Sequence, residues 1–269
     1  GAPGAGLQVE GEVLLRAAQA LPDFPGYVFG RHDQAFSALM NSLSGTETDE
    51  DGNATLEVAL PDPGPVGRPL EAVVTVRVAE GSGRPVERRA TQLVVPNESM
   101  IGLKPMFEGD VVPMNTEARF QVIALGPDLA PVADMPVKWK VNRIETDYQW
   151  YQSYGTWSWE PVTYRSLVAE GEATLGGAPV ELGASVDWGQ YELVVESTDG
   201  TLAVSSTKFW SGWYAPADTV SSPDTLDLSL DKPAYKSGDT ATLRIVPRAA
   251  GTALITVLSN RLVTMQAIE

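Results

Sequence analysis

Very few side chains in this sequence could carry out acid–base or nucleophilic chemistry. The chain has one histidine, His32, and no cysteine, so a cysteine nucleophile, a thiolate metal site and a disulfide framework are excluded within these residues. A Ser-His-Asp triad or a multi-histidine metal site would have to use His32. No serine or carboxylate constellation converges on it in the sequence. We therefore expect a solvent-exposed loop histidine, a chain that is not an enzyme, and no cofactor.

Acidic side chains gather in residues 46–53, which share one feature with a calcium-binding loop. With Gly52 at the sixth position of such a loop, Val58 falls at the last position, where a bidentate glutamate is required. We interpret the segment as an acidic turn and predict no metal site.

Aromatic side chains gather in residues 147–160, where they flank Gly155 in a pattern typical of a hairpin. An exposed aromatic row would suit carbohydrate stacking or a protein interface. Cross-strand pairing of the rings would instead only stabilise a protruding hairpin, and both interpretations stay open. The candidate interface aromatics are Tyr148, Trp150, Tyr151, Tyr154, Trp157 and Trp159.

The elements that position these residues are predicted to be short strands. The 25 glycines and 20 prolines are scattered between short apolar runs, which leaves few windows for a long helix. Apolar and polar residues alternate in 137–141, 226–230 and 241–245, so each segment turns one face inward; Trp139 lies on such a face. The spacing of strands and turns predicts an all-β fold of tandem antiparallel β-sandwiches.

The charge balance excludes several kinds of partner. Nineteen Lys and Arg against 35 Asp and Glu give a net charge of −16, so nucleic acid and anionic lipid surfaces would repel the chain on average. The sequence has no apolar run long enough to cross a bilayer and no signal peptide at its start. If the protein is exported, we expect the signal to lie outside this chain.

An internal repeat predicts the domain organisation. The pattern A-P-x-A-x-(L/M)-x-V-x-x-x-V occurs at residues 2–13 and again at 130–141, and the Lys-Pro pair at 104–105 recurs at 232–233. A period of this size matches one sandwich domain. We predict a first domain at 1–98 that lacks its opening strands, a complete domain with the aromatic hairpin at 99–216, and the truncated start of a third at 217–269. Short linkers around 96–101 and 216–223 would let these domains move as rigid bodies.

Residues 230–241 (LDKPAYKSGDTA) resemble the opening "L-D-K-x-x-Y-x-x-G-D-x-A" of macroglobulin-like domains in the alpha-2-macroglobulin and complement family. The aromatic hairpin, with Trp159-Glu160-Pro161, and the later segment 209–213 (FWSGW) are similar to the bacterial branch of that family.

The resemblance implies a scaffold fragment of a broad-spectrum protease inhibitor. In this family a protease cuts an exposed bait segment, the domains rearrange, and the protease is trapped, often through a Cys-Gln thioester. This chain has neither the thioester motif nor a lipidated cysteine, so the family's functional residues find no counterpart here.

The partners implied are target proteases, acting through the full-length protein, and neighbouring macroglobulin-like domains. The resemblance further implies a periplasmic protein, held at the inner membrane only by a lipid anchor outside this chain. The alternative is a cell-surface adhesin or a carbohydrate-binding tandem of immunoglobulin-like domains that uses the aromatic hairpin for stacking. Packed rings would favour the scaffold, and a row of exposed rings would favour the adhesin.

Overall fold

The computed structural model describes residues 4–79, 85–212, 227–232, 234–246, 251–258 and 262–268. Within these ranges every regular element is a strand, and every strand pair except one is antiparallel. The predicted all-β fold is confirmed.

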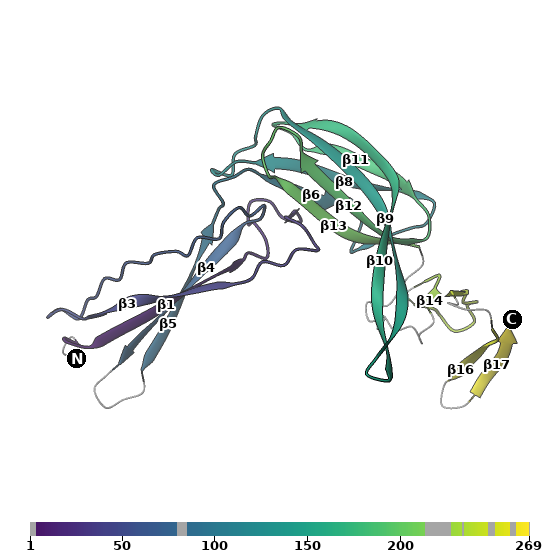
Figure 1. Cartoon of the computed structure of the whole chain (residues 1–269), viewed down its shortest axis with the longest axis horizontal. Helices are drawn as coiled ribbons and strands as arrows, with labels where there is room; N and C mark the ends of the chain where they lie inside the picture. The colour runs from purple at the N-terminus through teal and green to yellow at the C-terminus, as the bar shows by residue number, and fades with distance from the viewer. Residues whose placement is uncertain are drawn as a thin grey trace.

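The N-terminal part forms one four-stranded sheet in the order β3-β1-β4-β5 (Figure 1). The strands are β1 (Gln8–Ala17), β3 (Leu39–Glu47), β4 (Leu70–Ala79) and β5 (Val86–Val94). On one face of this sheet Val13, Leu15 and Leu70 are completely or almost completely buried. Phe36, from the loop before β3, packs against them. The sheet therefore has a small core of its own.

The central part is a sandwich of two sheets. The first has the order β10-β9-β12-β13-β7 and the second the order β11-β8-β6-β2. The strands of the first sheet are β7 (Val111–Val112), β9 (Met135–Ser153), β10 (Thr156–Leu175), β12 (Gly189–Ser197) and β13 (Val204–Ser211). Those of the second sheet are β2 (Val28–Phe29), β6 (Met100–Pro105), β8 (Thr116–Leu125) and β11 (Val180–Val186).

The core of the sandwich lies between these sheets and is rich in aromatic rings. Phe120 and Phe209 meet edge to face with centroids 5.2 Å apart and ring planes 62° apart, and Tyr191 stacks on Phe209 at 5.6 Å. Trp139 is only half-buried, but it packs against this core as its alternation predicts.

The sheet order reproduces the sequence repeat. The repeated segment that starts β1 also starts β9, and the order β3-β1-β4-β5 recurs as β10-β9-β12-β13. The two sheets are therefore built to one plan, with hairpins and loops of different length between the strands.

Two small hairpins follow near the C-terminus. One pairs β14 (Asp227–Leu230) with β15 (Leu243–Val246), and the other pairs β16 (Ala253–Leu258) with β17 (Leu262–Ile268). The strands expected at 226–230 and 241–245 thus occur, except that Leu226 and the linker at 216–223 lie outside the described residues. The three domain boundaries stay predictions.

Candidate functional site

The first feature that could carry function is the junction between the N-terminal sheet and the sandwich. Residues 21–33, here called the strap, leave the N-terminal sheet after β1 and run along the sandwich. Within the strap, β2 pairs with β6, where Val28 faces Leu103 and Phe29 faces Gly102. A strand from the first part of the chain therefore completes a sheet of the second.

The strap is fixed by apolar packing at its start. Leu21 is buried with Ile123 and Leu125 in a cluster that lies on the outer face of β8, opposite the sandwich core. Phe29 closes over Gly102 so tightly that a β-carbon added there would lie 2.8 Å from the Phe29 ring and 2.9 Å from Ile123. The junction is therefore packed like an interior rather than like a mobile link.

The end of the strap is fixed by hydrogen bonds. The backbone N–H of Gly30 donates to Ser205 Oγ at 2.8 Å, and this hydroxyl donates in turn to the Ile101 carbonyl at 2.5 Å. The Gly30 carbonyl accepts from the N–H of Ser206 at 3.1 Å. Ser205 and Ser206 are both buried, so these bonds are shielded from water.

His32 belongs to this junction, so the expectation of a solvent-exposed histidine was wrong. Its side chain is 14% exposed, its Nδ1 lies 2.7 Å from Ser206 Oγ, and its Nε2 lies 3.4 Å from Glu192 Oε2. The His32 backbone N–H also donates to Ser206 Oγ, so the backbone and the ring of His32 both contact this buried serine.

Glu192 is the buried carboxylate of this network. Its Oε1 accepts from Asn142 Nδ2 at 3.0 Å and from Arg165 Nε at 2.9 Å. Arg165 also lies 3.5 Å from Asp33 at the end of the strap. Arg165 is thus shared between a carboxylate of the sandwich and a carboxylate of the strap, which sets the register between them.

The titration of this network follows from its contacts. Burial lowers the pKa of His32 and Lys208 lowers it further, while Glu192 and Asp33 oppose the shift. The paired hydrogen bonds from Arg31 lower the pKa of Asp33 to about 2. The histidine is therefore neutral and Asp33 charged at neutral pH, which is a positioning network rather than an acid–base pair aimed at a substrate.

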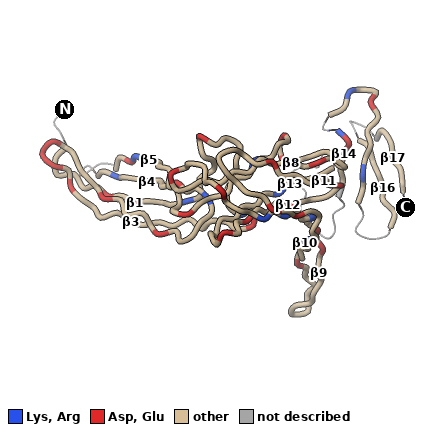
Figure 2. The backbone as a smooth tube through the Cα atoms, turned by 90° about the horizontal axis from the view of Figure 1, so that it is seen from above, with Lys and Arg blue, Asp and Glu red and all other residues tan. Residues whose placement is uncertain are grey.

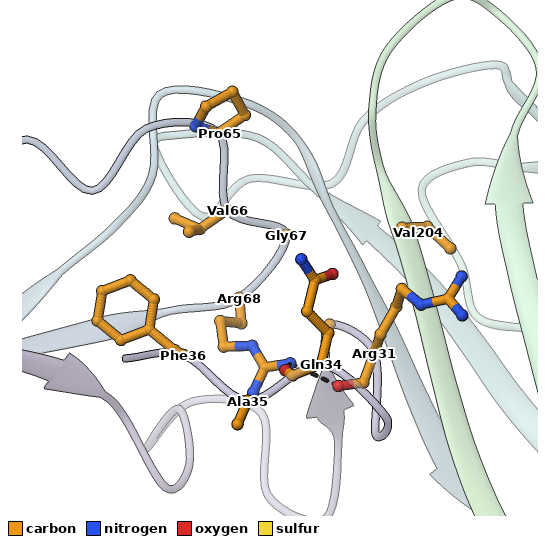
Figure 3. Close-up of a pocket in the computed structure, with 10 residues that line it drawn as sticks. Arg31, Gln34, Ala35, Phe36, Pro65, Val66, Gly67, Arg68 and Val204 are labelled. Carbon is orange, nitrogen blue, oxygen red and sulfur yellow. Dashed lines mark hydrogen bonds between the residues drawn. The ribbon is translucent and has the colours of Figure 1, made fainter. Parts of the chain in front are cut away.

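A small pocket of about 80 Å³ lies beside the strap (Figure 3). Arg68 reaches along it and donates from Nη2 to the carbonyls of Arg31 and Gln34 at 2.6 and 2.8 Å. Val66, Gly67 and Val204 line the other side (Figure 3). Both hydrogen bonds of Arg68 go to backbone carbonyls at the end of the strap. The role of this side chain is therefore to hold the strap in place.

The second feature is the aromatic hairpin, a two-stranded ribbon that projects from the sandwich (Figures 1 and 2). β9 and β10 pair along their whole length, from Met135 opposite Leu175 to Ser153 opposite Thr156. β12 pairs with β9 only as far as Ile144, so the rest of the β9–β10 ribbon has two strands. Tyr154 and Gly155 form the turn with φ of 51° and 80°, which fits the two-residue type I′ turn of hairpins. The predicted hairpin is confirmed.

The six candidate aromatics all lie on this ribbon, but the strand register divides them. Side chains directly opposite each other share a face, so the pair Trp150–Trp159 lies on the same face as Tyr148 and Trp157. Tyr151, opposite Ser158, lies on the other face, and Tyr154 is fully exposed at the tip. Trp150, Trp157 and Trp159 are 50%, 65% and 37% exposed, and Tyr148 meets Trp159 edge to face at 5.2 Å.

A third contact links the sandwich to the C-terminal hairpins. The guanidinium of Arg244 on β15 lies 4.3 Å from the centre of the Trp188 ring, and Trp188 meets Trp210 edge to face at 5.3 Å. The Trp188 ring is therefore held between β13 and the following unit.

Among the described residues no group of three or more His, Asp or Glu side chains is placed to hold a metal ion. The acidic segment 46–53 forms a turn in which Asp49 Oδ1 accepts from the N–H groups of Asp51 and Asn53. Within the described ranges no helix is long and apolar enough to span a membrane.

Comparison with known proteins follows the division seen in the fold. Residues 1–96 match the family model of the bacterial alpha-2-macroglobulin MG5 domain, and residues 102–213 match that of bacterial macroglobulin domain 6. An alpha-2-macroglobulin of Xylella fastidiosa (strain 9a5c) is 28% identical over 281 residues, which cover 100% of this chain and 17% of the relative.

Solved structures give the same result for the fold. The crystal structure of the Y1175G mutant of Salmonella alpha-2-macroglobulin has a TM-score of 0.66 and 26% identity, covering 100% of this chain and 18% of that one. Escherichia coli alpha-2-macroglobulin activated by porcine elastase has a TM-score of 0.61 and 24% identity, with coverages of 86% and 20%. The exposed ribbon alone would favour the adhesin, but these matches over both parts of the chain do not.

Proposed function

Because the chain belongs to the bacterial alpha-2-macroglobulin family, with its MG5 and MG6 domains matched in succession, we propose that it is a scaffold segment of a protease inhibitor. In this proposal a protease cuts a bait segment elsewhere in a longer polypeptide, and the domains rearrange to trap it. The chain spans 17% of the length of the first relative, so the trap itself is a property of the longer protein.

The observation that carries the proposal is the adjacent match to the two domains, supported by the solved structure of Escherichia coli alpha-2-macroglobulin activated by porcine elastase. The strap gives this segment a mechanical role. It joins the two matched domains by a shared sheet and a buried cluster, so we propose that they move as one block while the trap closes. Periplasmic location and a lipid anchor outside the chain remain part of the proposal.

The test uses the longer protein and a protease such as elastase. Enclosure predicts that the protease migrates with the inhibitor in size-exclusion chromatography, cleaves a short peptide, and fails to digest a large protein substrate. Residues 1–269 alone should leave both activities unchanged. If the longer protein is simply degraded while both substrates are cleaved at full rate, the proposed inhibitor function is wrong.

A matched pair of variants tests whether the two matched domains move as one block. Leu21→Asp in the longer protein places a charge in the buried junction, whereas Leu202→Asp places the same charge at a side chain that is 72% exposed. We expect loss of trapping only for Leu21→Asp, provided that bait cleavage still occurs at the same rate.

A further inference from the structure

We propose that the uncharged face of the aromatic ribbon docks against an apolar surface of another domain of the same longer polypeptide. This face, here called the ribbon face, comprises Tyr148, Trp150, Gln152, Trp157, Trp159 and Pro161. The proposal rests on the proposed function, because that function supplies the longer polypeptide.

The two faces of the ribbon differ in chemistry. On the ribbon face, Tyr148 opposes Pro161, Trp150 opposes Trp159, and Gln152 opposes Trp157. No residue between Tyr148 and Trp159 carries a charge, and the distal part of the ribbon is free of charged positions in Figure 2. The opposite face carries Asp147 and Glu160. One face is therefore suited to a dry contact, and the other to water.

The exposed rings are a large apolar surface for so slender an element. Three tryptophans that are one-third to two-thirds exposed leave roughly 300 Å² of apolar area open. This area matches the lower end of the largest apolar patch on a typical soluble protein, a patch that often has a function. Beyond Ile144 no third strand supports the ribbon within the described residues, and a lone two-stranded ribbon is marginally stable in water. Docking would supply the missing support.

The net charge of the chain limits which kinds of partner could bind the ribbon face. A net charge of −16 disfavours polyanions and anionic membranes, and a face without charges offers no ion pair to a basic partner. What remains complementary is an apolar protein surface that can surround the indoles and accept hydrogen bonds from their Nε1 atoms.

The chain already uses an indole ring in one contact between successive units. Trp188 of the sandwich lies under the guanidinium of Arg244 from the C-terminal hairpins, at 4.3 Å. The relative from Xylella fastidiosa has more than four-fifths of its length outside the matched region, so further domains of the same polypeptide would be held at high effective concentration near the ribbon. An intramolecular occupant therefore needs only modest affinity.

Hydroxyl-radical footprinting of the longer protein and of residues 1–269 tests the proposal without altering the sequence. We expect the modification rates of Trp150, Trp157 and Trp159 to fall by about threefold or more in the longer protein, because an interface core excludes water. Tyr151 and Tyr164, which lie off the ribbon face and are 42% and 52% exposed, are matched controls whose rates should change far less.

Each outcome decides the proposal. Equal rates for the three tryptophans in both proteins would overturn it. Protection in residues 1–269 that grows with protein concentration would assign the face to a second copy and also overturn it, as would protection that appears only on adding a neutral oligosaccharide. Trapping of elastase is measured separately, so docking without trapping, or trapping without docking, shows which of the two proposals has failed.

Discussion

Truncation of Leu21 gives the sharpest test of the strap. Leu21 lies in the N-terminal part of the sequence, but it is 1% exposed and packs on Ile123 and Leu125 of the sandwich. Leu21→Ala removes apolar atoms equivalent to about two to three methylene groups at about 0.8 kcal/mol each, and the cavity left behind adds to this loss. Because several neighbours are only half-buried and can relax, we expect a loss of about 2–3 kcal/mol in the free energy of unfolding.

The distribution of tryptophans provides the assay. The six tryptophans that the structure describes, from Trp139 to Trp210, lie in the sandwich and its ribbon. Tryptophan fluorescence therefore reports this part of the chain, whereas far-ultraviolet circular dichroism also reports the N-terminal sheet. If the strap couples the two parts, Leu21→Ala shifts the fluorescence midpoint in urea even though the substitution lies outside the sandwich sequence. Leu202→Ala, at a side chain that is 72% exposed, should change stability by less than about 0.5 kcal/mol. A shift seen by circular dichroism but absent from the fluorescence would refute the coupling.

Three further predictions concern single side chains. Burial lowers the folded-state pKa of His32 below its ordinary 6.5. The protein is therefore expected to keep its full stability above pH 6.5 and to lose part of it as the pH falls through the folded-state pKa, because the buried ring must then take up a proton. In paired urea titrations His32→Gln should remove this part of the pH dependence. Gly102→Val should destabilise the junction by about 1–3 kcal/mol, since its β-carbon would overlap Phe29 and Ile123, and a urea midpoint equal to wild type would contradict this. Tyr154→Asn should stabilise the ribbon by up to about 1 kcal/mol, because asparagine tolerates the positive φ of 51° better; slower amide exchange across the turn would show it.

Much of the fold was predictable because it depends on local patterns. Alternation placed β9, β14 and β15 correctly, and the aromatic segment was identified as a hairpin from its symmetry around Gly155. The motif at residues 230–241, which indicated the family, forms a turn that its own side chains stabilise. Asp231 Oδ1 accepts from the Tyr235 hydroxyl at 2.6 Å and from the N–H of Thr242 at 2.7 Å. These residues hold β14 beside β15, so the motif indicates a fold and not a chemical activity.

The junction was not predicted, because its contacts join residues far apart in the sequence. Gly30 and His32 bond to Ser205 and Ser206, which are more than 170 positions away. One local signal was available. On β8 the inward residues Phe120 and Val122 belong to the sandwich core, but the outward positions Ile123 and Leu125 are also apolar. Apolar residues on both faces of a strand indicate that something covers each face.

The strap also changes where bending can occur. The linker prediction treated residues 96–101 as a hinge, but the two matched domains are held by a shared sheet, the Leu21 cluster and the His32–Glu192–Arg165 network in addition to that link. Rotation about the link would have to break all three, whereas the contact of Arg244 with Trp188, both of them half-buried, is a stacking interaction worth about 0.5–2 kcal/mol. A rearrangement that passes through this segment is therefore expected to bend between the sandwich and the C-terminal hairpins before it separates the two matched domains.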